Sequence, residues 1–144
     1  MKTVQQIIST KENQTLISIA PNRPVFDALV ILAEYKIGAL AVLDGEKLVG
    51  IFSERDYARE IILKGRSSKT TMISEVMSSN IISINPHNTV EEAMLTMSDK
   101  RIRHLPVMVG EKVISMLSIG DVVKETIAYQ QRLIKELESY IQGN

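Results

Sequence analysis

Two copies of the pattern Ser-x-x-Asp carry the polar groups best suited to hold a small polar ligand. They are Ser53–Asp56, in the sequence SERD, and Ser118–Asp121, in SIGD. A serine at the start of a helix stands beside backbone N–H groups that lack a helical partner, and such groups suit a phosphate or a hydroxyl. The aspartate can accept hydrogen bonds from two neighbouring sugar hydroxyls. Helix capping alone also explains either pattern, so both interpretations stay open at this point.

A basic pair, Arg103 and His104, precedes the apolar sequence LPV. Arginine presents a planar fork of donors that fits a phosphate, and histidine adds another donor. The alternative is a solvent-exposed strand end, where such side chains commonly lie. In the first half of the chain, Gly38 and Ala39 occupy the matching positions and leave room for a flat base beside Ile37. Two sites built from these halves would therefore differ in charge.

These residues occupy matching positions of an internal repeat. Residues 16–62 align with residues 81–127 without a gap at a constant offset of 65, and about a third of the aligned positions are identical. A gapless alignment of this length indicates a tandem duplication. It divides the chain into an N-terminal helix and lead-in (1–15), repeat 1 (16–62), a basic, Ser/Thr-rich connector (63–80), repeat 2 (81–127) and a C-terminal helical extension (128–144).

Each repeat is predicted to fold as a β-α-β-β-α unit. In repeat 1 a strand over Leu16–Ile19 ends at Pro21, and a helix follows with apolar residues at helical spacing. Two strands, Ala39–Leu43 and Leu48–Phe52, are joined across Asp44-Gly45, a strong hairpin signal. A closing helix begins after Ser53. The corresponding strands of repeat 2 are Leu105–Val109 and Val113–Leu117, with the closing helix after Ser118.

Helices are also predicted at both ends of the chain. Residues 2–9 suggest a short helix that packs on the repeats. After Asp121 the helix is expected to continue to about Gln142 with one apolar stripe, made of Val123, Ile127, Ile134, Leu137 and Ile141. A helix that extends beyond its own domain usually buries such a stripe on a neighbour or on a second copy of the chain.

Composition excludes several classes of function. The chain has 144 residues, 44% of them hydrophobic, with 17 basic and 17 acidic residues and no cysteine. Zero net charge disfavours nucleic acid as a partner. No stretch resembles a signal peptide or a membrane span, so we expect a cytoplasmic protein with no membrane partner. Without a P-loop, a nucleophile set or metal-ligand spacing, we expect no enzyme, no catalytic residues and no metal site.

The repeat resembles the cystathionine-β-synthase (CBS) domain. The features that carry the resemblance are an apolar strand running into proline, a helix containing D/E-A, the string K/R-I-x-x-L-x-V, and a hairpin that closes in S-x-x-D. Residues 16–127 as a whole resemble a tandem pair of such domains, a Bateman module. The resemblance implies an α/β (α+β) fold with two sheets, helices outside, pseudo-two-fold symmetry and two clefts between the halves. Members of this family bind AMP, ADP, ATP, NAD(H) or S-adenosylmethionine and signal by conformational change.

The resemblance also implies a crossed pairing, in which the strand of one repeat faces the Ser-x-x-Asp end of the other. One cleft would combine Ser18, Ile19, Ile37, Gly38 and Ala39 with Ser118 and Asp121. The other would combine Ser83, Ile84, Ile102, Arg103 and His104 with Ser53, Arg55 and Asp56. Since ligand phosphates can converge on the symmetry axis, Arg103 and His104 could serve either cleft.

The expected function is that of a homodimeric regulator, an energy or redox sensor that binds AMP, ADP, ATP or NAD(H) between its repeats and acts on a protein partner. The alternative is a non-catalytic dimerisation or interaction scaffold whose clefts stay empty. Asp56 and Asp121 in both repeats, together with Arg103 and His104, favour the sensor, because a scaffold has no need of this polar set.

Overall fold

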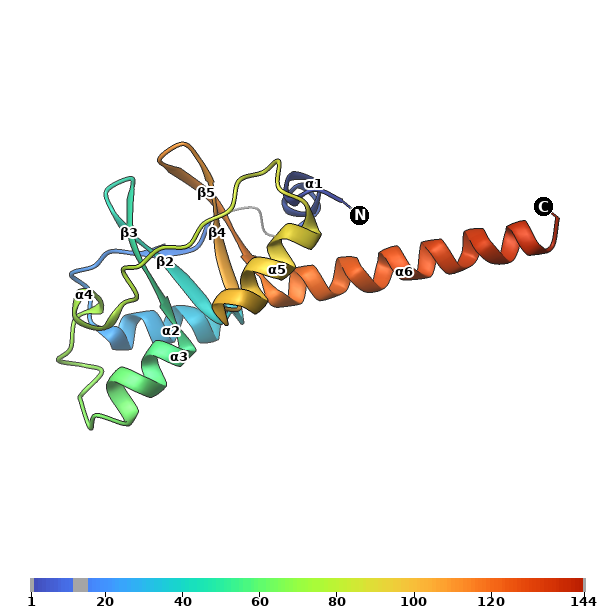
Figure 1. Cartoon of the computed structure of the whole chain (residues 1–144). Helices are drawn as coiled ribbons and strands as arrows, with labels where there is room; N and C mark the ends of the chain where they lie inside the picture. Colours follow the sequence, from blue (N-terminus) through green and yellow to red (C-terminus); the bar gives the residue numbers. More distant parts are fainter. Residues whose placement is uncertain (1, 12–15, 144) are drawn as a thin grey trace.

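Two small sheets form the centre of the molecule, one in each repeat. The computed structural model describes residues 2–11 and 16–143 and is shown in Figure 1. Its strands are β1 (Ser18–Ile19), β2 (Ala39–Asp44), β3 (Lys47–Ser53), β4 (His104–Val109) and β5 (Lys112–Ser118). In the first sheet β1 pairs parallel with β2, which pairs antiparallel with β3, and in the second β4 and β5 pair antiparallel. The predicted fold class, an α/β pair of repeats, is confirmed.

The two hairpins are close copies of each other. Their turns place Gly45 and Gly110 at φ of 64° and 61°, a left-handed conformation that glycine adopts at little cost. Each hairpin also has a register shift at the same place, between Val42 and Leu43 in one and between Val107 and Met108 in the other. The duplication therefore extends to the irregularities of the strands.

The opening strand is where the repeats differ. In repeat 1 it comprises only Ser18 and Ile19, shorter than expected, and in repeat 2 it is reduced to one parallel bridge between Ile84 and Val107. Pro106 stands at the position of Ala41, the partner of Ser18 in repeat 1. Because proline has no N–H to donate, the ladder of repeat 2 cannot extend there as it does in repeat 1.

Helices surround the sheets. They are α1 (Val4–Ser9), α2 (Val25–Tyr35), α3 (Glu54–Asp56), the π-helix η1 (Tyr57–Ile62), α4 (Ile73–Val76), α5 (Val90–Lys100) and α6 (Ile119–Ile141). The predicted terminal helices are confirmed as α1 and α6. The closing helix of repeat 1 is a single α-turn followed by a π-helix, whereas that of repeat 2 is a regular helix of 23 residues.

Each repeat is completed by the short helix that precedes the other one. Helix α1 precedes repeat 1 but packs on repeat 2, where the Val4 N–H donates to the Asn88 carbonyl at 2.8 Å. Helix α4 precedes repeat 2 but packs on repeat 1, where the Ile73 N–H donates to the Arg23 carbonyl at 2.9 Å. The segment before each repeat therefore ties the two halves together.

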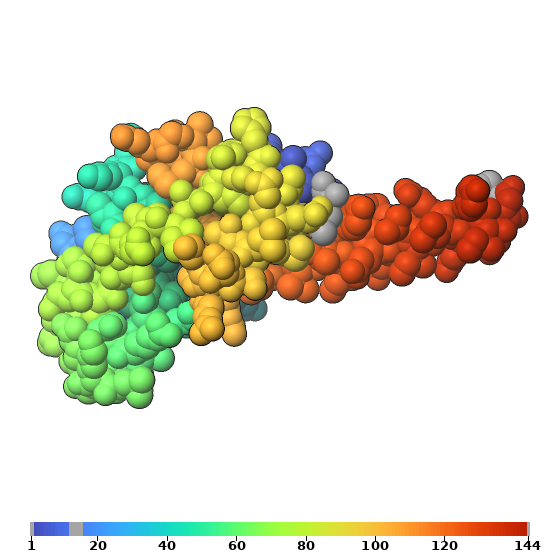
Figure 2. All heavy atoms as spheres, in the orientation of Figure 1, coloured from blue at the N-terminus to red at the C-terminus, as the bar shows by residue number. Residues whose placement is uncertain are grey.

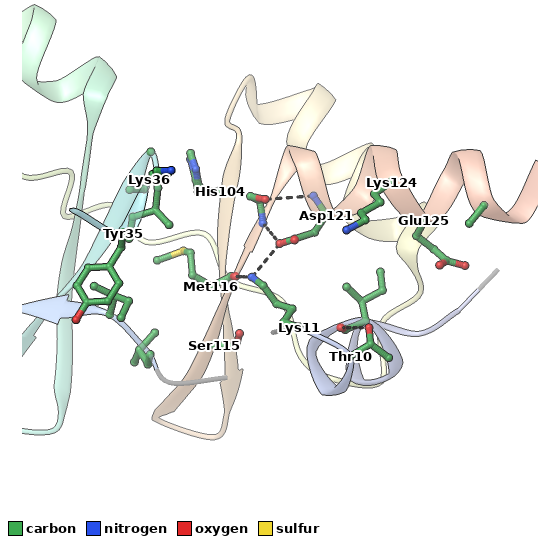
Figure 3. Close-up of a pocket in the computed structure, with 18 residues that line it drawn as sticks. Thr10, Lys11, Tyr35, Lys36, His104, Ser115, Met116, Asp121, Lys124 and Glu125 are labelled. Atoms are coloured by element: carbon green, nitrogen blue, oxygen red, sulfur yellow. Dashed lines mark hydrogen bonds and ion pairs between the residues drawn. The ribbon is translucent and has the colours of Figure 1, made fainter. Parts of the chain in front are cut away.

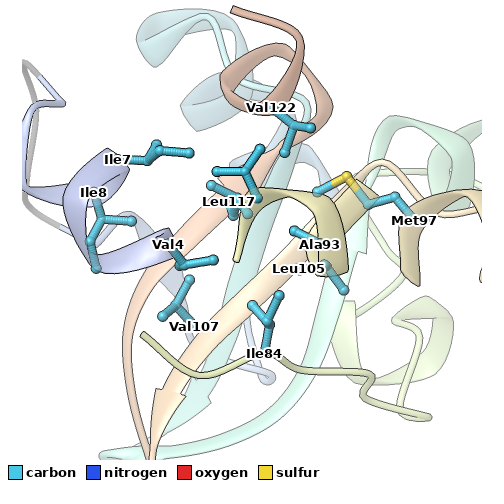
Figure 4. Packing of buried hydrophobic residues seen from close by; sticks show 11 residues of the cluster. Val4, Ile7, Ile8, Ile84, Ala93, Met97, Leu105, Val107, Leu117 and Val122 are labelled. Atoms are coloured by element: carbon cyan, nitrogen blue, oxygen red, sulfur yellow. The ribbon is translucent and has the colours of Figure 1, made fainter. Parts of the chain in front are cut away.

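The repeats have separate hydrophobic cores. Figure 4 shows the core of repeat 2, in which Val4 and Ile7 of α1 meet Leu105 and Leu117 of the sheet and Val122 of α6. The core of repeat 1 is built in the same way around Phe52, Leu40 and Ile73, all of them fully buried. A smaller cluster containing Ala41, Leu48 and Val113 joins the two sheets.

Helix α6 has two parts. Its first turns pack on α5 and β5, and the rest projects from the body as a rod (Figures 1 and 2). No helix within residues 2–11 and 16–143 is long and apolar enough to cross a membrane.

Candidate functional site

Two clefts lie where the repeats meet. Cleft 1 has a volume of about 710 Å³ and is bordered by the start of α6, and cleft 2 has a volume of about 580 Å³ and is bordered by α3. Both volumes fall in the usual range of small-molecule sites. Gly38 and His104 line both clefts and form part of the wall between them.

In cleft 1 the structure brings together residues from opposite repeats. Ile37, Gly38 and Ala39 come from the end of α2 and the start of β2, and Ser118 and Asp121 come from the end of β5 and the start of α6. Figure 3 shows this cleft with the side chains that line it. The geometry is that of the crossed pairing implied by the sequence resemblance.

Cleft 2 has the reciprocal composition. Its lining includes the predicted residues Ile102, Arg103 and His104 from repeat 2 and Ser53, Arg55 and Asp56 from repeat 1. The arrangement is possible because each Ser-x-x-Asp segment follows the last strand of its hairpin, and the two hairpins stand side by side across the pseudo-symmetry axis (Figure 1).

Four of the predicted site residues line neither cleft: Ser18, Ile19, Ser83 and Ile84. Ile19 and Ile84 are 7% exposed and belong to the cores of their repeats. The residues just before them, Leu16 and Ile17 in one cleft and Ile81 and Ile82 in the other, line the clefts instead. The residues that line the clefts thus lie about two positions earlier, before the chain enters the sheet.

Both Ser-x-x-Asp segments form capping boxes. The Ser118 N–H donates to Asp121 Oδ2 at 2.8 Å, and the Asp121 N–H donates to Ser118 Oγ at 3.2 Å. The matching bonds between Ser53 and Asp56 measure 2.9 and 3.2 Å. Capping therefore uses one oxygen of each carboxylate, and any role in binding falls to the other oxygen.

The hydrogen bonding of the second carboxylate oxygen differs between the two clefts. Asp56 Oδ1 accepts a hydrogen bond from Ser78 Oγ at 2.8 Å, so both oxygens of Asp56 are engaged within the protein. On Asp121, Lys11 Nζ lies 3.0 Å from Oδ2, the oxygen that already caps the helix. Among the described residues, none donates a hydrogen bond to Asp121 Oδ1. Cleft 1 thus offers a charged acceptor that cleft 2 lacks.

Three lysines that sequence reasoning missed line cleft 1. Lys11 Nζ donates to the Met116 carbonyl at 2.8 Å as well as to Asp121, and Lys36 and Lys124 lie around the same opening (Figure 3). Lys36 ends α2 in the left-handed conformation, as Arg101 ends α5. The repeat alignment pairs these two residues and gave a signal for Lys36, whereas nothing local marks Lys11.

Cleft 2 is more basic. Its lining contains Arg55, Arg59, Lys100 and Arg103, against the two carboxylates Glu54 and Asp56. Arg55 is held in place, because its Nη1 donates to the Arg101 carbonyl at 2.7 Å, across the boundary between the repeats. Gly120 stands at the matching position of repeat 2, so cleft 1 has no equivalent bond.

His104 occupies the wall that the clefts share. Close packing is required there, because a Cβ added to Gly38 would lie 3.1 Å from His104 Cε1 and 3.0 Å from Glu54 Oε1. Burial lowers the pKa of His104 from its ordinary value, with Arg103 and Lys11 contributing in the same direction and Glu54 and Asp121 opposing them. His104 is therefore mainly neutral at pH 7.

The lowered pKa of His104 predicts a loss of stability in mild acid. Because the unfolded chain binds this proton more readily than the folded one, stability is fully present above the unfolded pKa of about 6.5 and falls as pH drops through the folded value. The midpoint of urea unfolding, followed by circular dichroism from pH 7.5 to 5, is expected to fall less in His104→Asn than in the parent.

The exposed His87 provides a matched control for this measurement. His87→Asn is expected to keep the pH profile of the parent. An unchanged profile in His104→Asn would show that His104 does not cause the acid sensitivity.

The fold and the paired clefts define a class of proteins built from two tandem repeats with ligand-sized spaces between them. The family model described as the CBS domain matches residues 4–63 and 73–127. The chain therefore belongs to the CBS domain family, as the sequence resemblance indicated.

Relatives share this architecture over most of the chain. A mitochondrial CBS domain-containing protein of Arabidopsis thaliana, CBSX3, is 40% identical over 124 residues, which are 83% of this chain and 60% of the relative. A putative signal-transduction protein with CBS domains from Burkholderia ambifaria is 43% identical, with a TM-score of 0.85 over 88% of this chain and 95% of that one. The CBS domain pair of protein MJ0100, in complex with 5′-methylthioadenosine and S-adenosyl-L-methionine, is 23% identical, with a TM-score of 0.79 over 90% and 98% of the two chains.

Proposed function

We propose that this chain is a regulatory module that binds an adenosine-containing ligand, with cleft 1 as its principal site. The observation that carries the proposal is Asp121, whose Oδ1 accepts no hydrogen bond from residues 2–11 and 16–143, at the start of α6 and within a cleft also lined by Gly38 and Ala39. A vicinal sugar diol is a natural donor to such an acceptor. The complex of MJ0100 with two adenosine compounds supports this ligand class for a fold of this kind.

The lining of cleft 1 suits the other parts of a nucleotide. Ile17, Ile37 and the backbone at Gly38 offer a surface for the flat base, while Lys36 and the shared His104 stand where phosphates can bind. AMP, ADP, ATP and NAD(H) all satisfy these requirements. A ligand held in this way contacts both repeats and stabilises the relative packing it binds best, which is how it would signal to a protein partner.

Cleft 2 differs in what it can hold. Its four arginine and lysine side chains favour an anionic group, but Ser78 already donates to the oxygen of Asp56 that a sugar would use. A nucleoside in cleft 2 must displace Ser78 and so gains less from the carboxylate. We therefore expect cleft 1 to fill first.

Isothermal titration calorimetry of the full chain against AMP, ADP, ATP, NADH and S-adenosylmethionine tests the proposal. Micromolar binding of one compound with one equivalent per chain is expected. The absence of heat with every compound, on protein shown to be folded, would overturn the proposal in favour of the interaction scaffold with empty clefts.

The exposed apolar stripe of α6 supports a homodimer. A cytoplasmic location remains a prediction, since the name of the Arabidopsis relative places that protein in mitochondria. We propose no catalytic activity, because Asp56 and Asp121, the aspartates that line the clefts, serve as helix caps.

A further inference from the structure

The outer face of α6 carries an apolar seam that is interrupted only at Gln130. It consists of Val123, Ile127, Ile134, Leu137 and Ile141, each between 48% and 81% exposed. The opposite face is the one that meets the body, where Val122 is fully buried and Glu125 is 8% exposed. The seam residues therefore stay exposed both where α6 lies on the body and along the projecting rod.

The spacing of the seam is that of a coiled coil. Its members recur at alternating intervals of four and three residues, with Gln130 at the one polar position, so they occupy a and d positions of three heptads. At 1.5 Å per residue the seam is about 27 Å long. Glu125 links α6 to the N-terminal segment through Lys2 at 3.7 Å, and Arg132 of the same helix lies 2.9 Å from Glu125.

The two flanks of the seam differ in character. The e positions carry Lys124, Gln131 and Glu138, which are polar and oppositely charged at the two ends. The g positions carry Thr126, Leu133 and Tyr140, of which Leu133 and Tyr140 are exposed apolar side chains. One flank is therefore suited to ion pairs and the other to apolar contact.

Only one orientation of two such helices allows the e flank to form ion pairs and the g flank to form apolar contacts. In a parallel pair each e position meets a g position, so Lys124 and Glu138 would each face an apolar side chain, Ile119 or Leu133. In an antiparallel pair e meets e and g meets g. Lys124 then faces Glu138 of the second copy at both ends, with Leu133 beside its own counterpart in the middle.

We propose that α6 pairs antiparallel with α6 of a second copy of this chain, in the register that sets Val123 against Ile141 and Ile127 against Leu137. This inference specifies the homodimer of the proposed function and is independent of the ligand. Because Lys124 also lines cleft 1, the pairing places Glu138 of the second copy at the rim of that cleft.

Single-cysteine variants of the full chain test the orientation, because the chain has no cysteine of its own. In the proposed pair two copies of Gln131 lie opposite each other, whereas two copies of Ile141 are about 27 Å apart along the axis. Under mild oxidation Gln131→Cys is expected to form a disulfide-linked dimer and Ile141→Cys to stay unlinked. The reverse pattern would show a parallel pair and overturn the proposal.

Charge exchange tests the register. Lys124→Glu and Glu138→Lys are each expected to weaken the dimer about 10-fold in sedimentation equilibrium at low salt, and the double variant to regain most of the loss. Lys135→Glu makes the same charge change away from the seam and is expected to have little effect. Equal weakening by all three single variants, or no recovery in the double variant, would contradict the register.

The oligomeric state of the parent separates this proposal from the proposed function. A monomer by light scattering across the micromolar range overturns the pairing, and with it the homodimer, whether or not calorimetry detects a ligand. A dimer that binds no adenosine compound would retain the pairing and overturn the sensor.

Discussion

Asp121→Asn is expected to bind its adenosine ligand about 10- to 150-fold more weakly than the parent chain. Asparagine keeps an oxygen that can cap the Ser118 N–H, so the start of α6 stays formed. What disappears is the negative charge and the second oxygen, Oδ1, to which no described residue donates. A hydrogen bond to a charged acceptor contributes about 1.5–3 kcal/mol, which gives the stated range of affinities. Calorimetry with the ligand found for the parent measures the change.

Asp56→Asn is the matched control at the equivalent position of repeat 1. Both oxygens of Asp56 are already engaged, by Ser53 and by Ser78, so this carboxylate has less to offer a ligand. We expect the affinity of cleft 1 for the ligand to change by less than about threefold. If the two variants weaken binding equally, the clefts are equivalent and the assignment of cleft 1 as the principal site is wrong. If Asp121→Asn binds like the parent, Asp121 is not a ligand contact.

The parts of the fold that the sequence predicted well are those determined locally. A glycine after an acidic or apolar strand end specifies the hairpins at Gly45 and Gly110, and serine three residues before aspartate specifies the caps of α3 and α6. The repeat alignment then extended these predictions from one repeat to the other, because residues at matching positions of a gapless alignment are expected to have matching places in the two folded repeats. The predicted and observed structures agree where the conformation of a short segment is determined by the residues of that segment.

The crossing of α1 and α4 depended on long-range contacts and was not predicted. Each of these helices has a partner in the other repeat, and their alignment requires an offset of 69 residues where the repeats use 65. The similar segments Val4–Ser9 and Ile73–Ser78 contain that signal. Residues 63–80 were interpreted only as a connector between the repeats, so neither α4 nor Ser78 was predicted. Ser78 makes the two clefts chemically different, because it donates a hydrogen bond to Asp56.

The difference of two residues between the predicted positions and those that line each cleft has a simple physical origin. A shift of two residues along a strand keeps a side chain on the same face, so what separates core from cleft here is where β1 begins: Ile17 lies before the two-residue strand Ser18–Ile19. Ile19 turns into the core of repeat 1, and Ile17, two residues earlier and outside the ladder, faces cleft 1. The sequence alone did not show where the pairing with β2 begins.

Phe52→Ala is expected to lower the free energy of unfolding by about 3–5 kcal/mol. Phe52 is fully buried in the core of repeat 1, and its loss removes apolar contacts and leaves a cavity that the surrounding sheet and helices fill only in part. Urea unfolding followed by circular dichroism measures the change. Phe26, the other phenylalanine of the chain, is 43% exposed, and Phe26→Ala is expected to cost no more than about 1 kcal/mol.

The same variant shows whether the two repeats unfold as one unit. Phe52 lies in the core that includes α4, and α1 belongs to the core of the other repeat, so neither core is formed by one continuous repeat. Weakening repeat 1 should therefore destabilise repeat 2, and Phe52→Ala should unfold in a single transition at lower urea with an unchanged slope. Leu117→Ala, at the equivalent position of repeat 2, should give the same form of transition with a loss of about 2–5 kcal/mol. Two separate transitions in either variant would show that the crossed helices do not couple the unfolding of the two repeats.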